Sequence, residues 1–211
     1  MRPVETRNYV ASDSATFRKT SERWGGLSNM APGFPLEVNE IRIRTSEALY
    51  QACRFPHLPD VQRMIIEETS PMTAKMKSKP YRERSRPDWD AVRARVMRWC
   101  LRVKLAQNWE RFGALLIETD GRHIVEESRR DDFWGAIPTA DGHLVGRNVL
   151  GRLLMELREL LRRPSLESLR RVEPPHVPRC LLYGQPVLVV EGPAKFATAA
   201  HRPVSPLAAR G

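Results

Sequence analysis

Two long segments with helical periodicity restrict this chain to folds in which amphipathic helices bury one face each. In the segment Asp88–Gln107 and in the segment Asn148–Leu161, apolar residues recur at intervals of three and four, which places them on one face of a helix. In the first segment they are Trp89, Val92, Val96, Trp99 and Val103, and in the second they are Val149, Leu150, Leu153, Leu154, Leu157, Leu160 and Leu161.

Shorter signals predict the remaining elements. Leu36–Arg44 alternates apolar and polar residues around an Asn-Glu turn, which predicts a β-hairpin. Thr45-Ser46 and Ser70-Pro71 are helix-start signals. They predict helices at Glu47–Phe55 and Met72–Lys79, and we also expect a helix at Trp109–Ile117, strands at Arg122–Glu126 and Pro186–Glu191, and loops at Trp24–Pro35 and Asp131–Gly146. Because regular strand–helix alternation is absent, we predict an α+β fold: a mainly helical single domain with a small β-sheet.

The length of 211 residues suits one domain with an extension at each end. Residues 1–22 are polar, and we expect them to form a lead-in with weak order. Residues 23–162 contain the predicted helices and the hairpin and are assigned to the domain. Residues 163–211 form an extension rich in Pro and Arg, and its small-residue end is expected to be mobile.

The charge balance favours a polyanionic partner. The chain has 35 Lys and Arg against 25 Asp and Glu, a formal net charge of +10. Such an excess suits nucleic acid, nucleotides or pyrophosphates, and the alternative is a solvated basic surface with no specific partner. Arg95, Arg98 and Arg102 lie on the polar side of the 88–107 helix, and guanidinium groups bind phosphate with a planar fork of donors.

Several classes of protein are disfavoured. The three cysteines are far apart and the five histidines form no pair with metal-ligand spacing, so we predict no disulfide framework, no metal site and no cofactor. The first 18 residues lack the apolar core of a secretory signal, and no apolar run is long enough to span a bilayer. We therefore expect a cytoplasmic protein with no membrane partner.

Four separated clusters contain the side chains that could carry chemistry. Glu47 lies in the first turn of a predicted helix, with Tyr50 and Gln51 one turn further on. It is either an acid that complements the helix dipole or a general base at the mouth of a cleft. Lys75 is followed by a basic run to Arg86, which is either solvated surface or a phosphate site in which one lysine is activated as a nucleophile.

The other two clusters combine aromatic and polar residues. Trp89 begins the apolar stripe and either packs in the core or forms a wall on which a base or a nicotinamide ring stacks. The segment from Asp131 to Gly135 places two carboxylates beside Trp134, which is typical of a loop at a functional site. The alternative is an ordinary turn followed by a helix cap at Asn148.

The order of these clusters along the chain is more specific than any single cluster. From about Trp24 to Leu161 the chain contains, in sequence, Leu27-Ser28-Asn29, Ser46-Glu47-x-x-Tyr50-Gln51-Ala52, Ser70-Pro71-x-x-Ala74-Lys75, Arg86-Pro87-Asp88-Trp89, Asp131-x-x-Trp134-Gly135 and Asn148-x-Leu150-Gly151. This arrangement closely resembles the NADAR (YbiA-like) family, whose fold and catalytic domain we therefore expect in residues 23–162.

The chain departs from the family pattern at several positions near these motifs. The family usually has His at the position of Ala48, a Gln-Lys pair at Cys53-Arg54, an aromatic residue at Met30 and Arg at Asp132. These changes cluster around the expected pocket and suggest a subfamily with a different leaving group.

The resemblance implies an N-glycosidase that needs no metal. Some members of the family cleave phosphoribosylated intermediates of riboflavin synthesis, and others remove ADP-ribose from guanine in nucleic acid and act as the antitoxin to a DNA ADP-ribosyltransferase toxin. The basic balance of this chain favours the second role, with an ADP-ribosylated nucleic acid or nucleotide as substrate and the transferase toxin as partner. A non-catalytic module that binds ADP-ribose or nucleic acid is the alternative from another class.

The resemblance also implies roles for individual residues. Glu47 would stabilise an oxocarbenium-like transition state and activate water, and Asp131 would hold a ribose hydroxyl or share the acid–base work. Lys75 would either bind phosphate or attack the anomeric carbon to give a transient imine. The substrate-binding residues would be Ser28, Asn29, Tyr50, Gln51, Arg86, Trp89, Trp134, Gly135 and Asn148.

Overall fold

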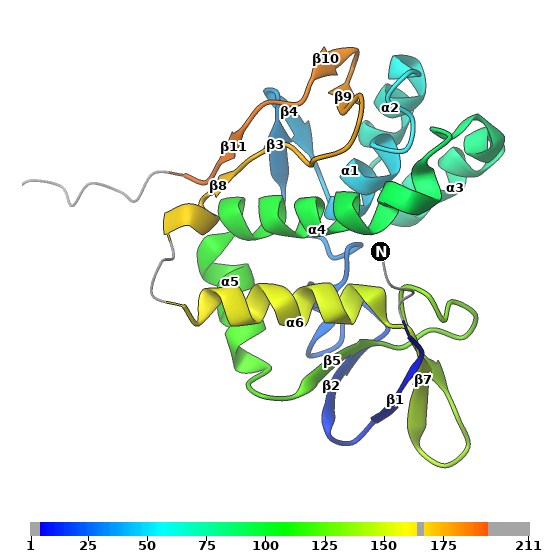
Figure 1. The fold of residues 1–211 in the computed structure, drawn as a ribbon, viewed down its shortest axis with the longest axis vertical. Helices are drawn as coiled ribbons and strands as arrows, with labels where there is room; N and C mark the ends of the chain where they lie inside the picture. Colours follow the sequence, from blue (N-terminus) through cyan, green and yellow to red (C-terminus); the bar gives the residue numbers. More distant parts are fainter. Residues whose placement is uncertain (1–4, 164–166, 194–211) are drawn as a thin grey trace, which may run out of the picture.

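The computed structural model describes residues 5–163 and 167–193, and of Pro71 only the backbone. Helix α4 (Trp89–Gln107) crosses the middle of the molecule and packs against α1, α5 and α6 (Figure 1). The expected mobile end of the chain, residues 194–211, lies outside the described residues.

The helices lie on both sides of α4. Helices α1 (Ser46–Ala52), α2 (Pro59–Ile66) and α3 (Pro71–Ser78) contact one another on one side, where the 3-10 helix η2 (Lys79–Arg84) leads into α4. Helices α5 (Trp109–Glu118) and α6 (Val149–Leu161) contact each other on the other side. Two short 3-10 helices, η1 (Gly25–Leu27) and η3 (Glu167–Leu169), complete the described helical elements. The predicted α4, α5 and α6 are confirmed.

The strands form several small sheets. Strands β1 (Arg7–Val10), β7 (His143–Gly146) and β6 (Ile137–Pro138) form one antiparallel sheet in that order, and β2 (Ser14–Phe17) pairs in parallel with β5 (His123–Glu126). Strand β3 (Leu36–Val38) pairs with β4 (Ile41–Ile43), β8 (Arg171–Val172) with β11 (Val190–Glu191), and β9 (Leu181–Leu182) with β10 (Gln185–Pro186), each antiparallel. The predicted α+β class, mainly helical with small sheets, is confirmed.

Local chemistry accounts for the predicted hairpin and helix starts. Asn39 and Glu40 both have positive φ, 52° and 63°, as the two central residues of a type I′ hairpin turn require. Thr45 caps α1 by accepting a hydrogen bond from the backbone N–H of Ala48, and Ser70 caps α3 in the same way. Helix α1 ends at Ala52, three residues before the predicted end, since Pro56 disfavours helical backbone at the residue before it.

Three expectations need correction. The lead-in is not weakly ordered in residues 5–22, because β1 and β2 pair with β7 and β5 and bury Tyr9 and Phe17. The loop expected at Asp131–Gly146 contains the hairpin β6–β7, and the single strand expected at Pro186–Glu191 is two strands, β10 and β11. Helix α2 was not predicted, although Pro59 at its start and its buried Val61 and Ile65 are ordinary helix signals.

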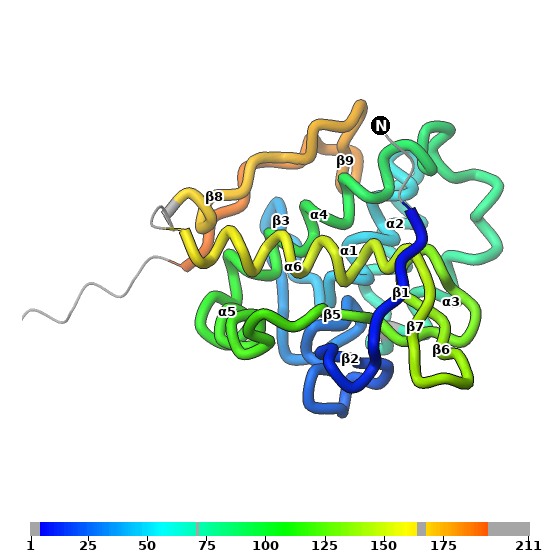
Figure 2. Tube along the Cα trace, turned by 60° about the horizontal axis from the view of Figure 1, so that its bottom comes forward, coloured from blue at the N-terminus to red at the C-terminus, as the bar shows by residue number. Residues whose placement is uncertain are grey.

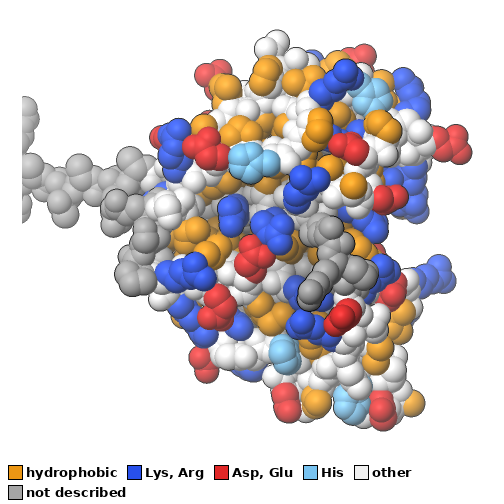
Figure 3. Space-filling view, viewed as in Figure 1, with side chains coloured by type: hydrophobic (Ala, Val, Ile, Leu, Met, Phe, Trp, Pro, Cys, Tyr) orange, Lys and Arg blue, Asp and Glu red, His pale blue; other side chains and the backbone are white. Residues whose placement is uncertain are grey.

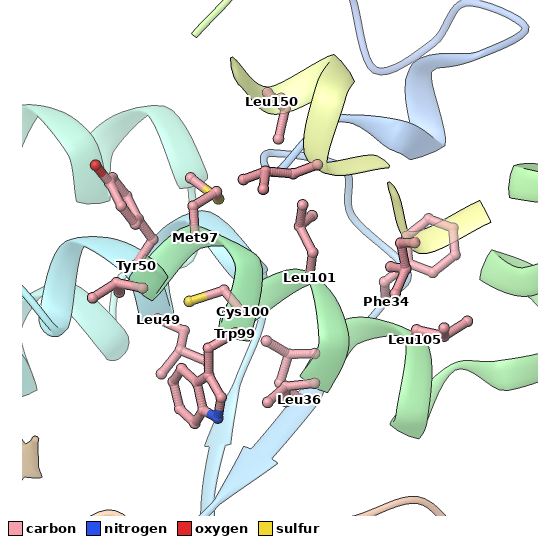
Figure 4. Close-up of a cluster of buried hydrophobic side chains, with 14 of the residues drawn as sticks. Phe34, Leu36, Leu49, Tyr50, Met97, Trp99, Cys100, Leu101, Leu105 and Leu150 are labelled. Carbon is pink, nitrogen blue, oxygen red and sulfur yellow. The ribbon is translucent and has the colours of Figure 1, made fainter. Parts of the chain in front are cut away.

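One main core joins the two sides of the molecule. Figure 4 shows Leu36 from β3, Leu49 from α1 and Leu150 from α6 around Met97 and Leu101 of α4, and all of these side chains are buried. Val172, Leu182, Val187 and Val190 of the C-terminal segment belong to the same core. Figure 2 shows β5 running alongside α6, with β2 next to it, and β5 contacts both elements. The end of β5 is therefore held firmly between its neighbours.

Within the described residues, no helix is both long enough and apolar enough to cross a membrane.

Candidate active site

Glu47 lies in the first turn of α1 and is held by two side-chain amides. One carboxylate oxygen, Oε1, accepts a hydrogen bond of 2.9 Å from Nε2 of Gln51, and Oε2 accepts one of 3.4 Å from Nδ2 of Asn29. Only 5% of the residue is exposed. An ionised carboxylate can only accept hydrogen bonds, and both side-chain partners of Glu47 are amide N–H donors, which stabilise the ionised form.

The Ser28-Asn29 loop is fixed to the start of α1. The carbonyl of Asn29 accepts from the backbone N–H of Glu47 at 3.1 Å and from the hydroxyl of Ser46 at 3.2 Å. Ser28 accepts from the backbone N–H of Met30 through its own hydroxyl. Oδ1 of Asn29 is buried and has no hydrogen-bond partner in the described part of the chain, so it remains free to accept from a substrate hydroxyl.

A second carboxyl group, Glu126, lies at the end of β5, and the sequence analysis did not predict it. The residue is half-buried. The pKa of this carboxyl is raised to about 7, chiefly by burial and also by the negative charges of Glu47 and Asp131, against the lowering effect of Lys75. These four charged groups come from α1, α3, β5 and the loop after β5, so the fold brings three of the predicted residues into electrostatic range of Glu126.

Asn148 positions the strand that carries Glu126. Its Nδ2 donates to the carbonyl of Ile124 at 2.8 Å, and its Oδ1 accepts from the backbone N–H of Glu126 at 3.2 Å. Asn148 itself is fully buried, with a left-handed backbone at φ 46°. Both polar atoms of the Asn148 side chain, which was predicted to bind substrate, are therefore hydrogen-bonded to β5. Asn148 was also predicted to cap the following helix, but its side chain forms no hydrogen bond to the start of α6.

The loop from Asp131 to Gly135 is locked to β5 and to the start of α6. Asp131 is exposed, and its Oδ1 accepts from the backbone N–H groups of Phe133 and Trp134 at 3.0 and 2.9 Å. Backbone carbonyls of residues 133, 134 and 135 accept from the N–H groups of residues 149, 150 and 148. A Cβ atom on Gly135 would lie 2.4 Å from the carbonyl oxygen of Glu126, so only glycine allows this approach.

Three aromatic rings form a wall beside Glu47. The ring of Tyr50 lies 5.0 Å from that of Trp89 and 5.5 Å from that of Trp134, the second pair edge to face. Burial raises the pKa of Tyr50 well above its ordinary value, and the charge of Glu47 adds to this. The predicted aromatic residues Trp89 and Trp134 therefore meet on Tyr50, at one side of the carboxylate.

Arginines border this aromatic wall. The guanidinium of Arg54 lies 5.3 Å from the ring of Trp89. That of Arg93 lies 3.7 Å from the ring of Phe133, which packs edge to face on Trp134 at 4.9 Å. Burial lowers the pKa of Arg54; the nearby positive charges of Arg82 and Arg93 lower it too, against Tyr50 and Asp90. Several cations near one aromatic surface are a suitable place for an anionic group of a ligand.

The remaining predicted residues take different positions. Lys75 is half-buried and acts on Glu126 through its charge. Arg86 is buried, and its guanidinium donates to the carboxylate of Asp88 and to the carbonyl of Pro178, so it braces the start of α4 against the C-terminal segment. The backbone carbonyl of Arg86 accepts from the backbone N–H of Trp89 at 3.1 Å, but the guanidinium of Arg86 is engaged by Asp88 and Pro178, and its role in phosphate binding stays a prediction. No three His, Cys, Asp or Glu side chains gather as metal ligands in residues 5–163 and 167–193.

The signal for Glu126 was present but weak. An acidic residue follows the buried pair Ile124 and Val125 at the carboxyl end of the predicted strand, only a few positions before Asp131. Such an acid is common on the exposed end of a strand. What distinguishes Glu126 is its desolvation and the charges around it, which come from other segments.

Comparison with known proteins matches this arrangement to one family. A NADAR domain matches residues 16–162. The chain is 40% identical over 149 residues to the N-glycosidase YbiA of Escherichia coli (strain K12), a match that covers 69% of this chain and 86% of that protein. It is 31% identical over 156 residues to a chloroplastic riboflavin biosynthesis protein, PYRR, of Zea mays, covering 68% of this chain and 24% of that protein.

The fold agrees with a solved structure. The NMR structure of the Escherichia coli protein YbiA is similar to the chain with a TM-score of 0.62 and 35% identity, covering 74% of this chain and 89% of that one. The matched region contains Glu47, Glu126 and the aromatic wall. On the family match and the relative at 40% identity, the chain belongs to the NADAR domain family.

Proposed function

We propose that this NADAR chain, an N-glycosidase like its YbiA relatives, hydrolyses the bond between ribose and nitrogen in ADP-ribosylated guanine of nucleic acid. The observation that supports it best is the pair of unequal carboxyl groups, Glu47 and Glu126. Glu47 is held by amide donors as an acceptor, whereas burial raises the pKa of Glu126 to about 7 and lets it carry a proton near neutral pH.

The proposed reaction assigns one task to each carboxyl group. As the bond between C1′ and nitrogen breaks, its electron pair goes to the nitrogen, and Glu126 donates a proton to that leaving group. The carboxylate of Glu47 stabilises the positive charge that develops on the sugar and accepts a proton from the attacking water, whose oxygen bonds to C1′. Asp131 shares this acid–base work or holds a ribose hydroxyl, as predicted from the sequence.

The arginines at the aromatic wall support a phosphate-bearing substrate. Glu47 lies in the first turn of α1, and Arg54 lies two residues after the end of that helix. Tyr50 lies between them and is within electrostatic range of both. A ribose at Glu47 could therefore place its phosphates near Arg54 and Arg93, with the base or sugar against Trp89 and Trp134.

The nucleic-acid part of the proposal rests on charge. The chain carries a formal charge of +10. Figure 3 shows Lys and Arg side chains spread across one face of the molecule, with acidic side chains among them. A nucleic-acid strand adds backbone phosphates that such a surface can neutralise. The proposed biological role is that of an antitoxin to a DNA ADP-ribosyltransferase, in the cytoplasm.

The test uses matched substrates and one variant. The chain is incubated with DNA that carries ADP-ribosylated guanine, and free ADP-ribose is measured together with the restored base. Glu47→Gln should lower the rate by a factor of about 10² to 10⁴. If the wild type releases no ADP-ribose, and both the wild type and Glu47→Gln still bind the modified DNA, the chain is instead a non-catalytic binding module.

A second candidate is an N-glycosidase of a phosphoribosylated intermediate of riboflavin synthesis. The similarity to a protein named for riboflavin biosynthesis favours it. The aminopyrimidine ribotide is therefore assayed in parallel, and faster release of ribose 5-phosphate from it than of ADP-ribose from DNA would support this candidate.

The role of Lys75 is tested separately. In the alternative route its amine attacks C1′, expels the guanine nitrogen and forms an imine after ring opening. Borohydride would reduce that imine to a stable adduct of about the mass of the sugar ligand. If the wild type turns over substrate in the presence of borohydride and no adduct is trapped, the imine route is excluded.

A further inference from the structure

Lys104 is a fully buried lysine in α4, away from the aromatic wall. None of its surface is exposed, and its Nζ donates to the carbonyl of Gly26 at 2.7 Å and to the carbonyl of Ser28 at 3.0 Å. Nζ also lies 4.4 Å from the ring of Phe34 and 4.3 Å from that of Phe112. Burying an ammonium group is costly, and an apolar residue of similar volume would pack here more cheaply.

The two carbonyls that Lys104 binds belong to the loop that holds Glu47. The next residue, Asn29, donates from Nδ2 to Oε2 of Glu47 at 3.4 Å. Its carbonyl accepts from the backbone N–H of Glu47 at 3.1 Å. The Lys104 ammonium is therefore connected to the Glu47 carboxylate by two hydrogen bonds, one to the carbonyl of Ser28 and one from the side chain of the next residue, Asn29.

We infer that Lys104 is a positioning residue for the Glu47 site: its buried ammonium holds the carbonyls of Gly26 and Ser28, and thereby sets the position of Asn29 against the Glu47 carboxylate. This rests on the proposed function only in so far as Glu47 is catalytic. The residue touches no reacting atom, so its effect is on orientation. Such effects are large because a displacement of about 1 Å at a catalytic group can cost about 10² in rate.

The surroundings of Lys104 make its hold on the Gly26–Ser28 loop sensitive to pH. Burial lowers its pKa to about 7. No carboxylate forms an ion pair with it in the described part of the chain. Arg111 stacks on Phe34 and Arg23 stacks on Trp24. The acids on the elements packed around Lys104, Glu110 and Glu118 of α5 and Glu37 of β3, are exposed, and Glu118 pairs with Arg23. A neutral amine keeps two N–H donors but loses its attraction to the two phenylalanine rings, so the loop should loosen as pH rises through 7.

The first experiment measures kinetics and stability of Lys104→Met. We expect kcat to fall by a factor of about 10 to 10² with a much smaller change in KM. The matched control is Val172→Ala, a buried residue of the same main core on β8, which should lower the melting temperature and leave kcat unchanged. A loss of kcat in Lys104→Met no larger than that in Val172→Ala would overturn the inference.

The second experiment needs neither a substrate nor a change at Lys104. NMR signals of the Asn29 and Gln51 side-chain amides are followed against pH in Glu126→Gln, so that titration of Glu126 does not contribute. We expect a transition near pH 7 in the Asn29 signal, because Lys104 titrates there. Signals that stay constant from pH 6 to 9 would contradict the inference. A protein that cleaves none of the substrates but shows this transition would refute the proposed function and retain the positioning role.

Discussion

Replacing Glu126 with glutamine keeps the size of the side chain and removes the proton that it can carry. The pKa of this carboxyl is raised from 4.5 to about 7, chiefly by burial and then by Glu47. At pH 7 about half of the molecules therefore hold the proton that the proposed reaction delivers to the leaving nitrogen. We expect Glu126→Gln to lower kcat by a factor of about 10² to 10⁴. In the wild type, kcat should fall about tenfold per pH unit above 7, whereas Glu126→Gln should keep only the decline that titration of Lys104 causes.

The same group makes a contribution to stability whose sign can be worked out. A carboxyl whose pKa is raised by folding stabilises the folded state fully below 4.5, and that contribution is lost as pH rises through about 7. The interval from 4.5 to about 7, at about 1.4 kcal/mol per pH unit, gives about 3 kcal/mol as an upper limit for this half-buried group. Glu126→Gln removes the dependence, so it should match the wild type near pH 4.5 and exceed it near pH 8.

The assay is urea unfolding of both proteins at several pH values between 4.5 and 8, together with steady-state kinetics over the same range. Two results would refute the reasoning. One is an equal slope of unfolding free energy against pH in both proteins, which would mean that Glu126 is not desolvated by the fold. The other is a normal kcat in Glu126→Gln, which would remove this residue from the reaction.

Three further changes probe the neighbours of this carboxyl. Glu47→Gln should lower the pKa of Glu126, because the charge of Glu47 is one of the causes that raise it; a carbon-13 NMR titration that still gives about 7 would contradict the coupling. Gly135→Ala should cost about 1–3 kcal/mol in urea unfolding and also reduce kcat, since the added Cβ would lie 2.4 Å from the carbonyl oxygen of Glu126. Asn148→Ala should cost about 1–3 kcal/mol by leaving the buried carbonyl of Ile124 without its donor, and an unchanged unfolding midpoint would show that water replaces the amide.

Local signals explain how much of the fold could be predicted. Helix α3 was predicted from Ser70-Pro71, and its cap is formed as the residue types imply. Strand β1 was missed because only Tyr9 of its four residues is buried, and its partner lies at residues 143–146. A strand of this kind is specified by pairing across the chain, which composition and short-range periodicity do not reveal.

The candidate site likewise contains residues that local motifs predict and residues that only the folded chain reveals. Motif order selected Glu47, Tyr50 and Asp131, and in the fold the charges of Glu47 and Asp131 both act on Glu126, although nothing in their spacing along the chain fixes that geometry. Glu126 could not be selected, because what sets it apart is the loss of water around its carboxyl and the charges that three other segments bring near it. Lys104 was hidden for a related reason: a lysine near the end of an amphipathic helix is ordinarily on the surface.

The parallel pairing of β2 with β5 has a consequence for any shortened version of the protein. The family match begins at residue 16, inside β2, so a chain started there would lack β1 and half of the strand that lies beside β5. Backbone groups of β5 would be left without partners, and Val125 would lose the cover of Tyr9. Glu126 would keep its register partner Phe17, but β5 would be open to water at His123 and Ile124, and we expect the pKa of Glu126 to fall toward its ordinary value. We therefore expect residues that precede the family match to affect the acid as well as the fold.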